Sequence, residues 1–435
     1  MLIATENIKF LSESYFDPIG RVFFAQGRVF RAIESEYVQQ TLDFLESPLF
    51  EELQKRRWLV RTWESHDVQI DGYELILEHE WVKCISPSVW TFSQLKDALL
   101  FNMQIDELCK KYGSRLRDAR YSNITFVNGR PIFVDFGSFI GDLECYLEKD
   151  FALLVYPPLY LYSEREFMLS RIWQENALNF YRAKQVAPQI VLEDSMLFRR
   201  ILSNRVRNYD VYVRQKYPHF KVFTKCGMYL IKAINKIAQR LFHKDSIWKL
   251  FKYEANYKNP STKLIERILP PYNQKDTFAY SIENLDVDTL TNDLLGIDAK
   301  TMMLYGNYDS NDIIRLGEQF YGNIIVASND YIYTDQLYKM LKSLNANINV
   351  VCLNLLTETS DVILKELYVD VIVINERFND LSHLTANSAY KLVMRCHDMC
   401  KYLYVADREI LNELYSKGFA SLYEKTRYSN IWKSI

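Results

Sequence analysis

Three polar residues between positions 118 and 135 have the types and the order that phosphoryl transfer requires. In the segment LRDARYSNITFVNGRPIFVDFGSF, Asp118 lies five residues before Asn123, and Asp135 lies twelve residues after Asn123. A carboxylate can orient or deprotonate an acceptor hydroxyl, while an amide oxygen and a second carboxylate can hold the Mg²⁺ that neutralises a triphosphate. The competing interpretation is structural: a turn after a strand at Asp135 and a helix end at Asp118.

The elements around these residues must bring them to one cleft. Two strand-like runs, NITFVNG and RPIFVDFG, are joined by Asn128 and Gly129, a dipeptide that strongly favours a β-hairpin. Before them, apolar residues recur at helical spacing from 91 to 112, and Gly113 is placed to end that helix. Further upstream, the sequence predicts a hairpin over 20–33 around Gln26 and Gly27, a helical stretch over 34–57 and a strand over 73–82.

This segment resembles the protein-kinase and aminoglycoside-kinase superfamily. The Asp-to-Asn offset matches the catalytic loop of that superfamily, and Asp135 opens an Asp-Phe-Gly triplet. The resemblance implies that Asp118 is the catalytic base, that Asn123 and Asp135 bind Mg²⁺, and that ATP is the phosphate donor.

The N-terminal part departs from the kinase pattern. It has no GxGxxG before the first strands and no lysine at a VAIK-like position, and Leu116 stands where many kinases have histidine. Arg31 is the candidate cation for the phosphates, and Glu36 on the following helix is its candidate partner. An arginine presents a fixed donor fork and does not reproduce the point charge of a lysine.

Beyond residue 278 the pattern changes to strands that alternate with helices. The strand candidates lie at about 20- to 28-residue spacing, which indicates a parallel sheet with crossover helices. They are TMMLYG (301–306), NIIVAS (323–328), INVVCL (348–353), VDVIVI (369–374) and YLYVAD (402–407).

The whole chain resembles bacterial proteins that fuse a kinase-like domain to a class I methyltransferase-like domain and act in surface polysaccharide synthesis. The resemblance rests on DPIGRVFFAQGRVFRAIESE, on GYELILEHEWV and on the segment around Asp118. It implies that Gly306 and Asp330 contact S-adenosylmethionine, as backbone turn and ribose acid. Only 28 residues follow Asp407, and we expect this to be too short for a helix plus the antiparallel strand pair that usually completes a methyltransferase sheet.

Together these patterns predict an α+β kinase-like domain over 1–195, a helical basic segment over 196–275, and an α/β Rossmann-like, class I methyltransferase-like domain over 276–435. A length of 435 residues suits two or three domains. The seven cysteines lack CxxC spacing, which argues against a disulfide framework and fits a reducing cytoplasm.

The middle segment concentrates positive charge. Residues 199–267 carry 17 Lys and Arg against four Asp and Glu, although the whole chain has a formal net charge of -2. Within 228–244, Lys232, Lys236, Arg240 and Lys244 follow at four-residue intervals and would form one stripe on a helix. Such a helix can lie on an anionic membrane surface, or it can pack on its neighbours with a solvated basic face. We do not expect nucleic acid as a partner, because no recognisable nucleic-acid-binding module accompanies the basic segment.

The main prediction is an ATP-dependent phosphotransferase that acts on a hydroxyl of a carbohydrate or lipid-linked glycan. Two alternatives stay open: an S-adenosylmethionine-dependent methyltransferase whose kinase-like part is structural, and a non-catalytic assembly factor at a membrane surface. The sequence shows no signal peptide and no spanning run, so we expect a cytoplasmic protein, peripheral at the inner face of the membrane if the basic stripe attaches it.

Overall fold

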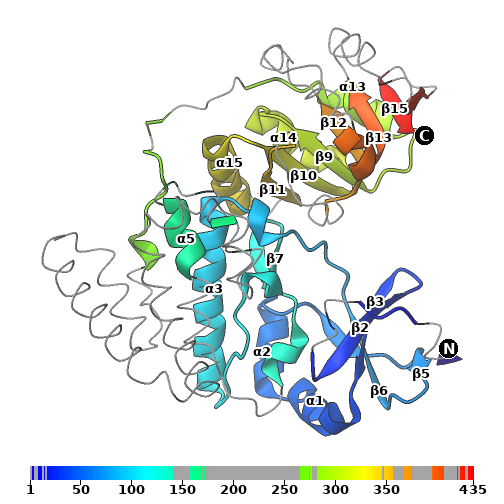
Figure 1. Ribbon diagram of the computed structural model, residues 1–435, viewed down its shortest axis with the longest axis vertical. Coiled ribbons are helices and arrows are strands. Elements are labelled where there is room, and N and C mark those ends of the chain that lie inside the picture. The colour runs from blue at the N-terminus through cyan, green and yellow to red at the C-terminus, as the bar shows by residue number, and fades with distance from the viewer. Residues whose placement is uncertain are drawn as a thin grey trace, which may run out of the picture. The chain divides into compact units, whose positions relative to one another are not determined.

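The computed structural model describes residues 17–140, 282–344, 347–355, 367–374, 394–405, 422–426 and 430–435, with shorter stretches near 2–14, 156–174 and 265–276 and residue 419. The chain forms two compact units, whose described helices and strands are shown in Figure 1. The first comprises residues 1–117, 121–144 and 269–435, and the second comprises residues 118–120 and 145–268. Helix α5 (Tyr156–Ser163) belongs to the second unit. The two predicted domain boundaries, near residues 195 and 275, stay predictions.

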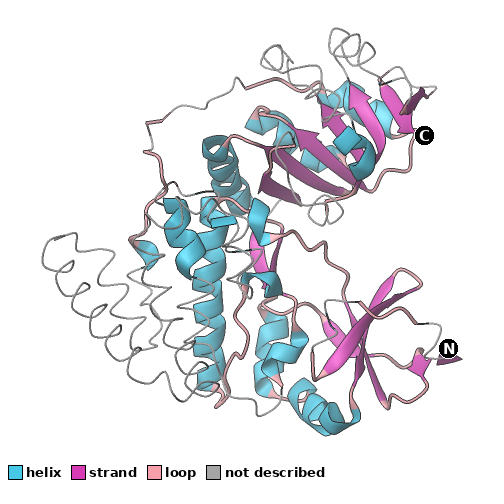
Figure 2. Cartoon of the chain, viewed as in Figure 1, coloured by secondary structure: helices cyan, strands magenta, loops and turns pink. Residues whose placement is uncertain are grey.

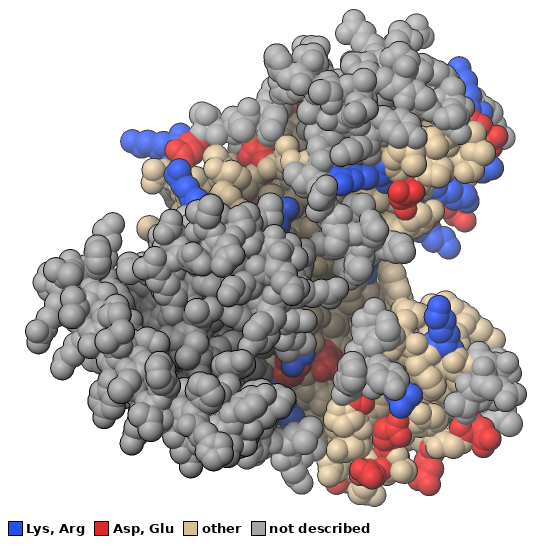
Figure 3. Space-filling model, in the orientation of Figure 1, with Lys and Arg blue, Asp and Glu red and all other residues tan. Residues whose placement is uncertain are grey.

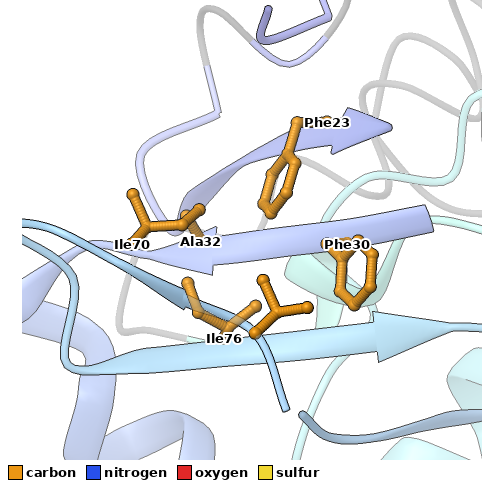
Figure 4. Packing of buried hydrophobic residues seen from close by; sticks show 6 residues of the cluster. Phe23, Phe30, Ala32, Ile70 and Ile76 are labelled. Atoms are coloured by element: carbon orange, nitrogen blue, oxygen red, sulfur yellow. The ribbon is translucent and has the colours of Figure 1, made fainter. Parts of the chain in front are cut away.

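A four-stranded antiparallel sheet stands near the N-terminus (Figure 2). Its strand order is β2 (Gly20–Ala25), β3 (Arg28–Ile33), β6 (Leu75–His79) and β4 (Thr62–Glu64). The predicted hairpin at Gln26 and Gly27 is confirmed, because β2 and β3 pair in register on both sides of that turn. A two-residue strand, β1 (Leu2–Ile3), pairs with β5 (Gln69–Ile70). One face of this region buries an apolar cluster of Phe23, Phe30, Ala32, Val68, Ile70 and Ile76 (Figure 4).

Two helices of the N-terminal part begin at side-chain caps. After the short turn η3 (Ser35–Tyr37) come α1 (Val38–Leu45) and α2 (Pro48–Lys55), and the Ser47 side chain accepts the Phe50 N–H at the start of α2. Helix α3 (Phe92–Lys111) begins at a capping box formed by Thr91 and Gln94. The helix predicted over 91–112 is therefore confirmed.

The second predicted hairpin is also confirmed. Strands β7 (Ile124–Val127) and β8 (Arg130–Phe133) pair antiparallel across Asn128 and Gly129. Both turn residues have positive φ, 52° and 68°, which is the conformation that a two-residue turn of this kind requires. Short turns flank the hairpin: η5 (Tyr121–Asn123) before it and η6 (Phe136–Phe139) after it, and η4 (Pro87–Val89) precedes α3.

The C-terminal part of the first unit is a seven-stranded mixed sheet. Its order is β11 (Ile348–Cys352), β10 (Asn323–Ser328), β9 (Thr301–Tyr305), β12 (Val369–Ile374), β13 (Cys400–Val405), β15 (Ile431–Ser434) and β14 (Tyr423–Lys425). The first five strands in this order are parallel, and β15 runs antiparallel to both β13 and β14. The described helices that accompany the sheet are α13 (Val287–Leu294), α14 (Ser310–Gln319) and α15 (Tyr331–Leu344).

This topology corrects one expectation. The 28 residues after Asp407 were expected to be too short for a helix plus an antiparallel strand pair, yet β14 and β15 both form there, while residues 406–418, where the helix would lie, are outside the described ranges. The pair fits because the strands have only three and four residues. The five longer strands lie where the sequence predicts them, within two residues at each end.

Within the first unit, helix α3 and the β7–β8 hairpin contact the β11 edge of the seven-stranded sheet. The carboxylate of Asp335 on α15 is fully buried and accepts the Ser93 N–H at 2.7 Å, the Lys339 ammonium at 2.7 Å and the Tyr272 hydroxyl. The Gln94 amide donates to the Val350 carbonyl of β11 at 3.1 Å. The N-terminal part thus satisfies polar groups that this edge of the sheet would otherwise leave unpaired.

Candidate functional site

Arg31 on β3 forms the centre of a charged cluster. Its guanidinium contacts Asp17, and its Nη2 lies 3.1 Å from Oδ1 of Asp135; only 5% of the Arg31 side chain is exposed. Burial raises the pKa of Asp17, the Arg31 charge opposes that rise, and the Asp135 charge adds to it. We call Asp17, Arg31 and Asp135 the Arg31 cluster.

The protein itself engages both carboxylate oxygens of Asp135. Oδ1 accepts the Gly137 N–H at 3.2 Å besides Arg31, and Oδ2 accepts the Ser138 hydroxyl at 2.5 Å. Arg31 therefore carries one positive charge against two carboxylates. Such a centre is net negative and would repel phosphate groups.

The structure also describes the other residues predicted for phosphoryl transfer. Asp118 belongs to the second unit, where it accepts the Arg120 N–H at 3.2 Å and pairs with the Arg120 guanidinium at 3.3 Å. Asn123 belongs to the first unit and ends η5, and its carbonyl accepts the Val134 N–H at 2.8 Å. Glu36 is exposed in η3, and in the described residues Arg31 pairs with Asp17 and Asp135 instead of Glu36.

The sequence interpretation missed Asp17. The signal available was Asp17 followed by Pro18, which favours a turn ahead of strand β2. That turn forms, with the Asp17 carboxylate accepting the Ile19 N–H at 3.0 Å. Nothing in the local pattern shows that the same carboxylate reaches Arg31 on the neighbouring strand.

A second group of polar residues lies at the carboxyl end of β9 and β10. Gly306 directly follows β9 with φ at 139°, a conformation that side chains disfavour, and its N–H donates to the Ala327 carbonyl at 2.9 Å. The next residue, Asn307, is 2% exposed, and its Oδ1 accepts the Ser328 hydroxyl at 2.6 Å. The Asn307 Nδ2 is buried and has no hydrogen-bond partner among the described residues. We call residues 306–309 the β9 loop.

Asp330 lies two residues beyond β10 and caps helix α15. Its Oδ1 accepts the N–H groups of Ile332 at 2.9 Å and Tyr333 at 3.0 Å, and its own N–H donates to the Ser328 hydroxyl at 3.0 Å. With 2% of its surface exposed, Asp330 is buried in this arrangement. Asn354, after β11, is half-buried, and Asn375, after β12, lies outside the described residues.

Two tyrosines close the β9 loop. The Tyr333 hydroxyl accepts the Tyr308 N–H at 2.9 Å and donates to the Tyr308 carbonyl at 2.9 Å. Burial raises the pKa of Tyr333, so this phenol stays neutral and can donate. The Tyr308 hydroxyl in turn donates to the Tyr305 carbonyl at 3.1 Å.

Comparison with known proteins gives distant matches. No family model matches the sequence. A stretch of 128 residues, 28% of the chain, is 29% identical to the nodulation protein NoeA of Rhizobium meliloti (strain 1021), and the chain spans about a quarter of that relative's length, 26%.

Solved structures with some likeness are methyltransferases. The N-methyltransferase NodS from Bradyrhizobium japonicum WM9 matches 34% of this chain and 92% of its own at 8% identity, with a TM-score of 0.26. A TehB-like SAM-dependent methyltransferase from Corynebacterium glutamicum ATCC 13032 Kitasato matches 34% of this chain and 85% of its own at 13% identity, with a TM-score of 0.25. At these scores the description of the fold rests on the strand order and not on the matches.

The prediction of an ATP-dependent phosphotransferase is therefore wrong as the main activity. The candidate phosphate-binding cation, Arg31, is already paired with two carboxylates, and the seven-stranded sheet carries the antiparallel strand pair that completes a methyltransferase sheet. The comparisons give no support to the predicted Mg²⁺ and ATP. In the described ranges, no group of three or more His, Cys, Asp or Glu side chains could hold a metal ion.

The proposed membrane-binding stripe over 228–244 lies outside the described residues. On the face shown in Figure 3, blue and red side chains lie among one another in the described part of the surface. None of the described helices is both long enough and apolar enough to cross a bilayer.

Proposed function

We propose that this chain is an S-adenosylmethionine-dependent methyltransferase whose N-terminal part has a structural role. The observation that carries the proposal is the strand order β11-β10-β9-β12-β13-β15-β14 with β15 antiparallel. Class I methyltransferase sheets usually end in an antiparallel strand pair, and the sequence alone gave reason to expect that this chain lacks it. The presence of the pair therefore supports the resemblance. In open α/β sheets, ligands bind outside the carboxyl ends of the parallel strands.

The residues at that edge fit an adenosyl ligand. Gly306 keeps the backbone free of a side chain directly after β9, where a ligand would approach. Asn307 offers a buried Nδ2 donor that has no partner among the described residues. A buried donor without a partner is costly and is relieved when a ligand supplies an acceptor. When bound, S-adenosylmethionine would supply a methyl group that is electrophilic because it is attached to a sulfonium.

We assign different roles to the two polar residues near the end of β10, Ser328 and Asp330. Asp330 was predicted to bind the ribose hydroxyls, but its Oδ1 accepts two N–H groups at the start of α15. Ser328 ends β10 itself and holds Asn307 in place. We therefore assign Asp330 to fixing the start of α15, and Ser328 and Asn307 to the ligand side of the loop.

The N-terminal part supports the sheet. Asp335, fully buried on α15, is held by Ser93 at the start of α3, and the Tyr338 hydroxyl donates to Asp97 at 2.7 Å. These contacts hold α15 against α3. The acceptor we propose, a hydroxyl or amine of a carbohydrate or lipid-linked glycan, is supported by the resemblance to proteins of surface polysaccharide synthesis.

The test is calorimetric titration of the full-length chain with S-adenosylmethionine. We expect saturable binding at one site, and at least a tenfold weaker affinity in Gly306→Val, because a side chain is strained at φ 139° and would stand where the ligand approaches. Gly113→Val is the matched control: Gly113 also has positive φ, 74°, but a Cβ there meets nothing within 4 Å. No heat from the wild type at millimolar ligand would contradict the proposal.

A further inference from the structure

The chain begins the seven-stranded sheet at β9 and adds its later strands on both sides of it. From β9 the chain continues outward through β10 to β11, whereas β12 lies on the other side of β9 and leads on to β13. The carboxyl ends of β9 and β12 are therefore the topological switch point of this sheet. Open α/β sheets bind their ligands in the crevice at such a point.

The Tyr308 side chain occupies that position. Its hydroxyl lies 3.1 Å from the Tyr305 carbonyl, at the last residue of β9, and 3.4 Å from the Val373 carbonyl, one residue before the end of β12. The side chain thus spans the ends of both strands. Only 1% of Tyr308 is exposed, so the ring is fully buried there.

Neutral hydrogen bonds hold the β9 loop over this point. Tyr333 binds both the N–H and the carbonyl of Tyr308 at 2.9 Å. A short parallel bridge adds two backbone hydrogen bonds, from the Glu283 N–H to the Asn307 carbonyl at 2.8 Å and from the Asp309 N–H to the Glu283 carbonyl at 2.9 Å. These four contacts are neutral hydrogen bonds, so breaking them exposes polar groups but separates no charges.

We propose that the Tyr308 phenol fills part of the ligand crevice and must leave it before an adenosyl ligand can enter. The inference rests on the proposed function and deepens it by naming the residue that limits access. Gly306, at the base of the loop, is the residue best able to change conformation as the loop opens. Because the ligand binds the open form, its apparent affinity falls by the fraction of the protein that is open.

Substitutions that release Tyr308 should therefore tighten binding. In titrations of the full-length chain with S-adenosylmethionine, we expect about five- to tenfold tighter binding in Tyr308→Phe, which loses both contacts to strand carbonyls. Tyr333→Phe should tighten binding to a similar degree, since it frees the backbone of Tyr308. Tyr308→Ala, which removes the ring, should bind at least as tightly as Tyr308→Phe.

The matched control is Tyr338→Phe. Tyr338 is another buried tyrosine on α15, and its hydroxyl also has two partners, Asp97 at 2.7 Å and the Gly129 carbonyl at 3.2 Å. Because these partners lie away from the β9 loop, its affinity should stay within twofold of the wild type. A similar gain in the control would overturn the inference, since general loosening would then explain the effect.

The remaining outcomes separate the two proposals. If the wild type binds and both Tyr308 variants bind equally or more weakly, Tyr308 is a fixed part of the ligand site and the inference alone is wrong. If Tyr308→Ala binds S-adenosylmethionine and the wild type does not, the inference is supported, and the proposal that the native chain is a methyltransferase is wrong. Absence of binding by every variant would overturn both.

Discussion

The Arg31 cluster and the β9 loop are both closed by the protein's own side chains, but with different chemistry. In the Arg31 cluster, a guanidinium that is 5% exposed is held between two carboxylates. At the β9 loop, tyrosine hydroxyls and backbone groups hold Tyr308 over the switch point. Opening the first separates buried charges, whereas opening the second exchanges neutral hydrogen bonds for others.

This difference indicates which region can take a ligand. Separating a buried ion pair leaves charges without compensation, which costs several kcal/mol, while a neutral hydrogen bond contributes a net 0.5–1.5 kcal/mol, roughly, to stability. Contact for contact, the hydrogen bonds at the β9 loop are therefore easier to break than the ion pairs of the Arg31 cluster. We infer that the cluster stabilises the N-terminal part and that the loop belongs to the ligand site.

Removal of the Arg31 charge is the change with the largest expected effect. Arg31→Met should lower the free energy of unfolding by about 3 kcal/mol, because Asp17 and Asp135 would face each other without a cation. Urea denaturation of the full-length chain measures the loss.

Arg21→Met is the control for that substitution. Arg21 is also on β2–β3, but its side chain is 39% exposed and lies 3.7 Å from Glu34, so its loss should change stability by less than about 1 kcal/mol. Equal effects of the two substitutions would contradict the claim that the Arg31 cluster is a buried structural centre.

The pH dependence of the free energy of unfolding tests whether the N-terminal part is as tightly buried as the structure indicates. Burial, with a smaller contribution from the Arg31 charge, lowers the pKa of His79 to about 3, and its Nδ1 hydrogen-bonds to the Thr62 hydroxyl at 2.8 Å. The unfolded chain takes up this proton near pH 6.5, so the stabilisation is complete above that pH and is lost as the pH falls toward 3. Between pH 7 and pH 5 the wild type should lose about 2 kcal/mol through this group.

His79→Asn tests this dependence because asparagine does not titrate. The stability curve of the variant should be flatter than that of the wild type between pH 7 and pH 5, as measured by urea denaturation at each pH. Parallel curves would show that His79 titrates normally and that its surroundings are less dry than the structure indicates.

The smallest effect is expected at the β9 loop. Tyr333→Phe removes a hydroxyl with two neutral partners, so it should lower the free energy of unfolding by only about 1 kcal/mol. Thermal and urea denaturation check this value. A loss as large as that of Arg31→Met would mean that the loop is a structural centre too, and the contrast between the two regions would disappear.

Turn residues and hydrophobic patterns in the sequence were sufficient to predict both hairpins and the five parallel strands. Asn128 and Gly129 predicted one hairpin, Gln26 and Gly27 the other, and apolar runs at regular spacing marked the five parallel strands. These succeed because turn conformation and strand burial depend mainly on residues close in sequence. The short antiparallel pair β14 and β15 was not predicted, because strands of three and four residues are too short to show a hydrophobic pattern.

The functional residues were harder, because their partners are distant in sequence. The Asp-Phe-Gly triplet at Asp135 suggested a metal ligand, but the local pattern does not show that Arg31, 104 residues away, holds this carboxylate. The ribose contact expected of Asp330 stays a prediction, and the structure adds that its Oδ1 caps α15. Tyr308 carries no motif, and only the strand order shows that it lies at the switch point.

The most direct test of the account is photo-crosslinking of the full-length chain with methyl-labelled S-adenosylmethionine, followed by peptide mapping. Label in peptides that contain residues 305–309 or 328–333, and competition by unlabelled S-adenosylhomocysteine, is the predicted result. Label confined to peptides around Asp17, Arg31 or Asp135, or no label above that of the denatured chain, would contradict the claim that the carboxyl edge of the seven-stranded sheet is the ligand site.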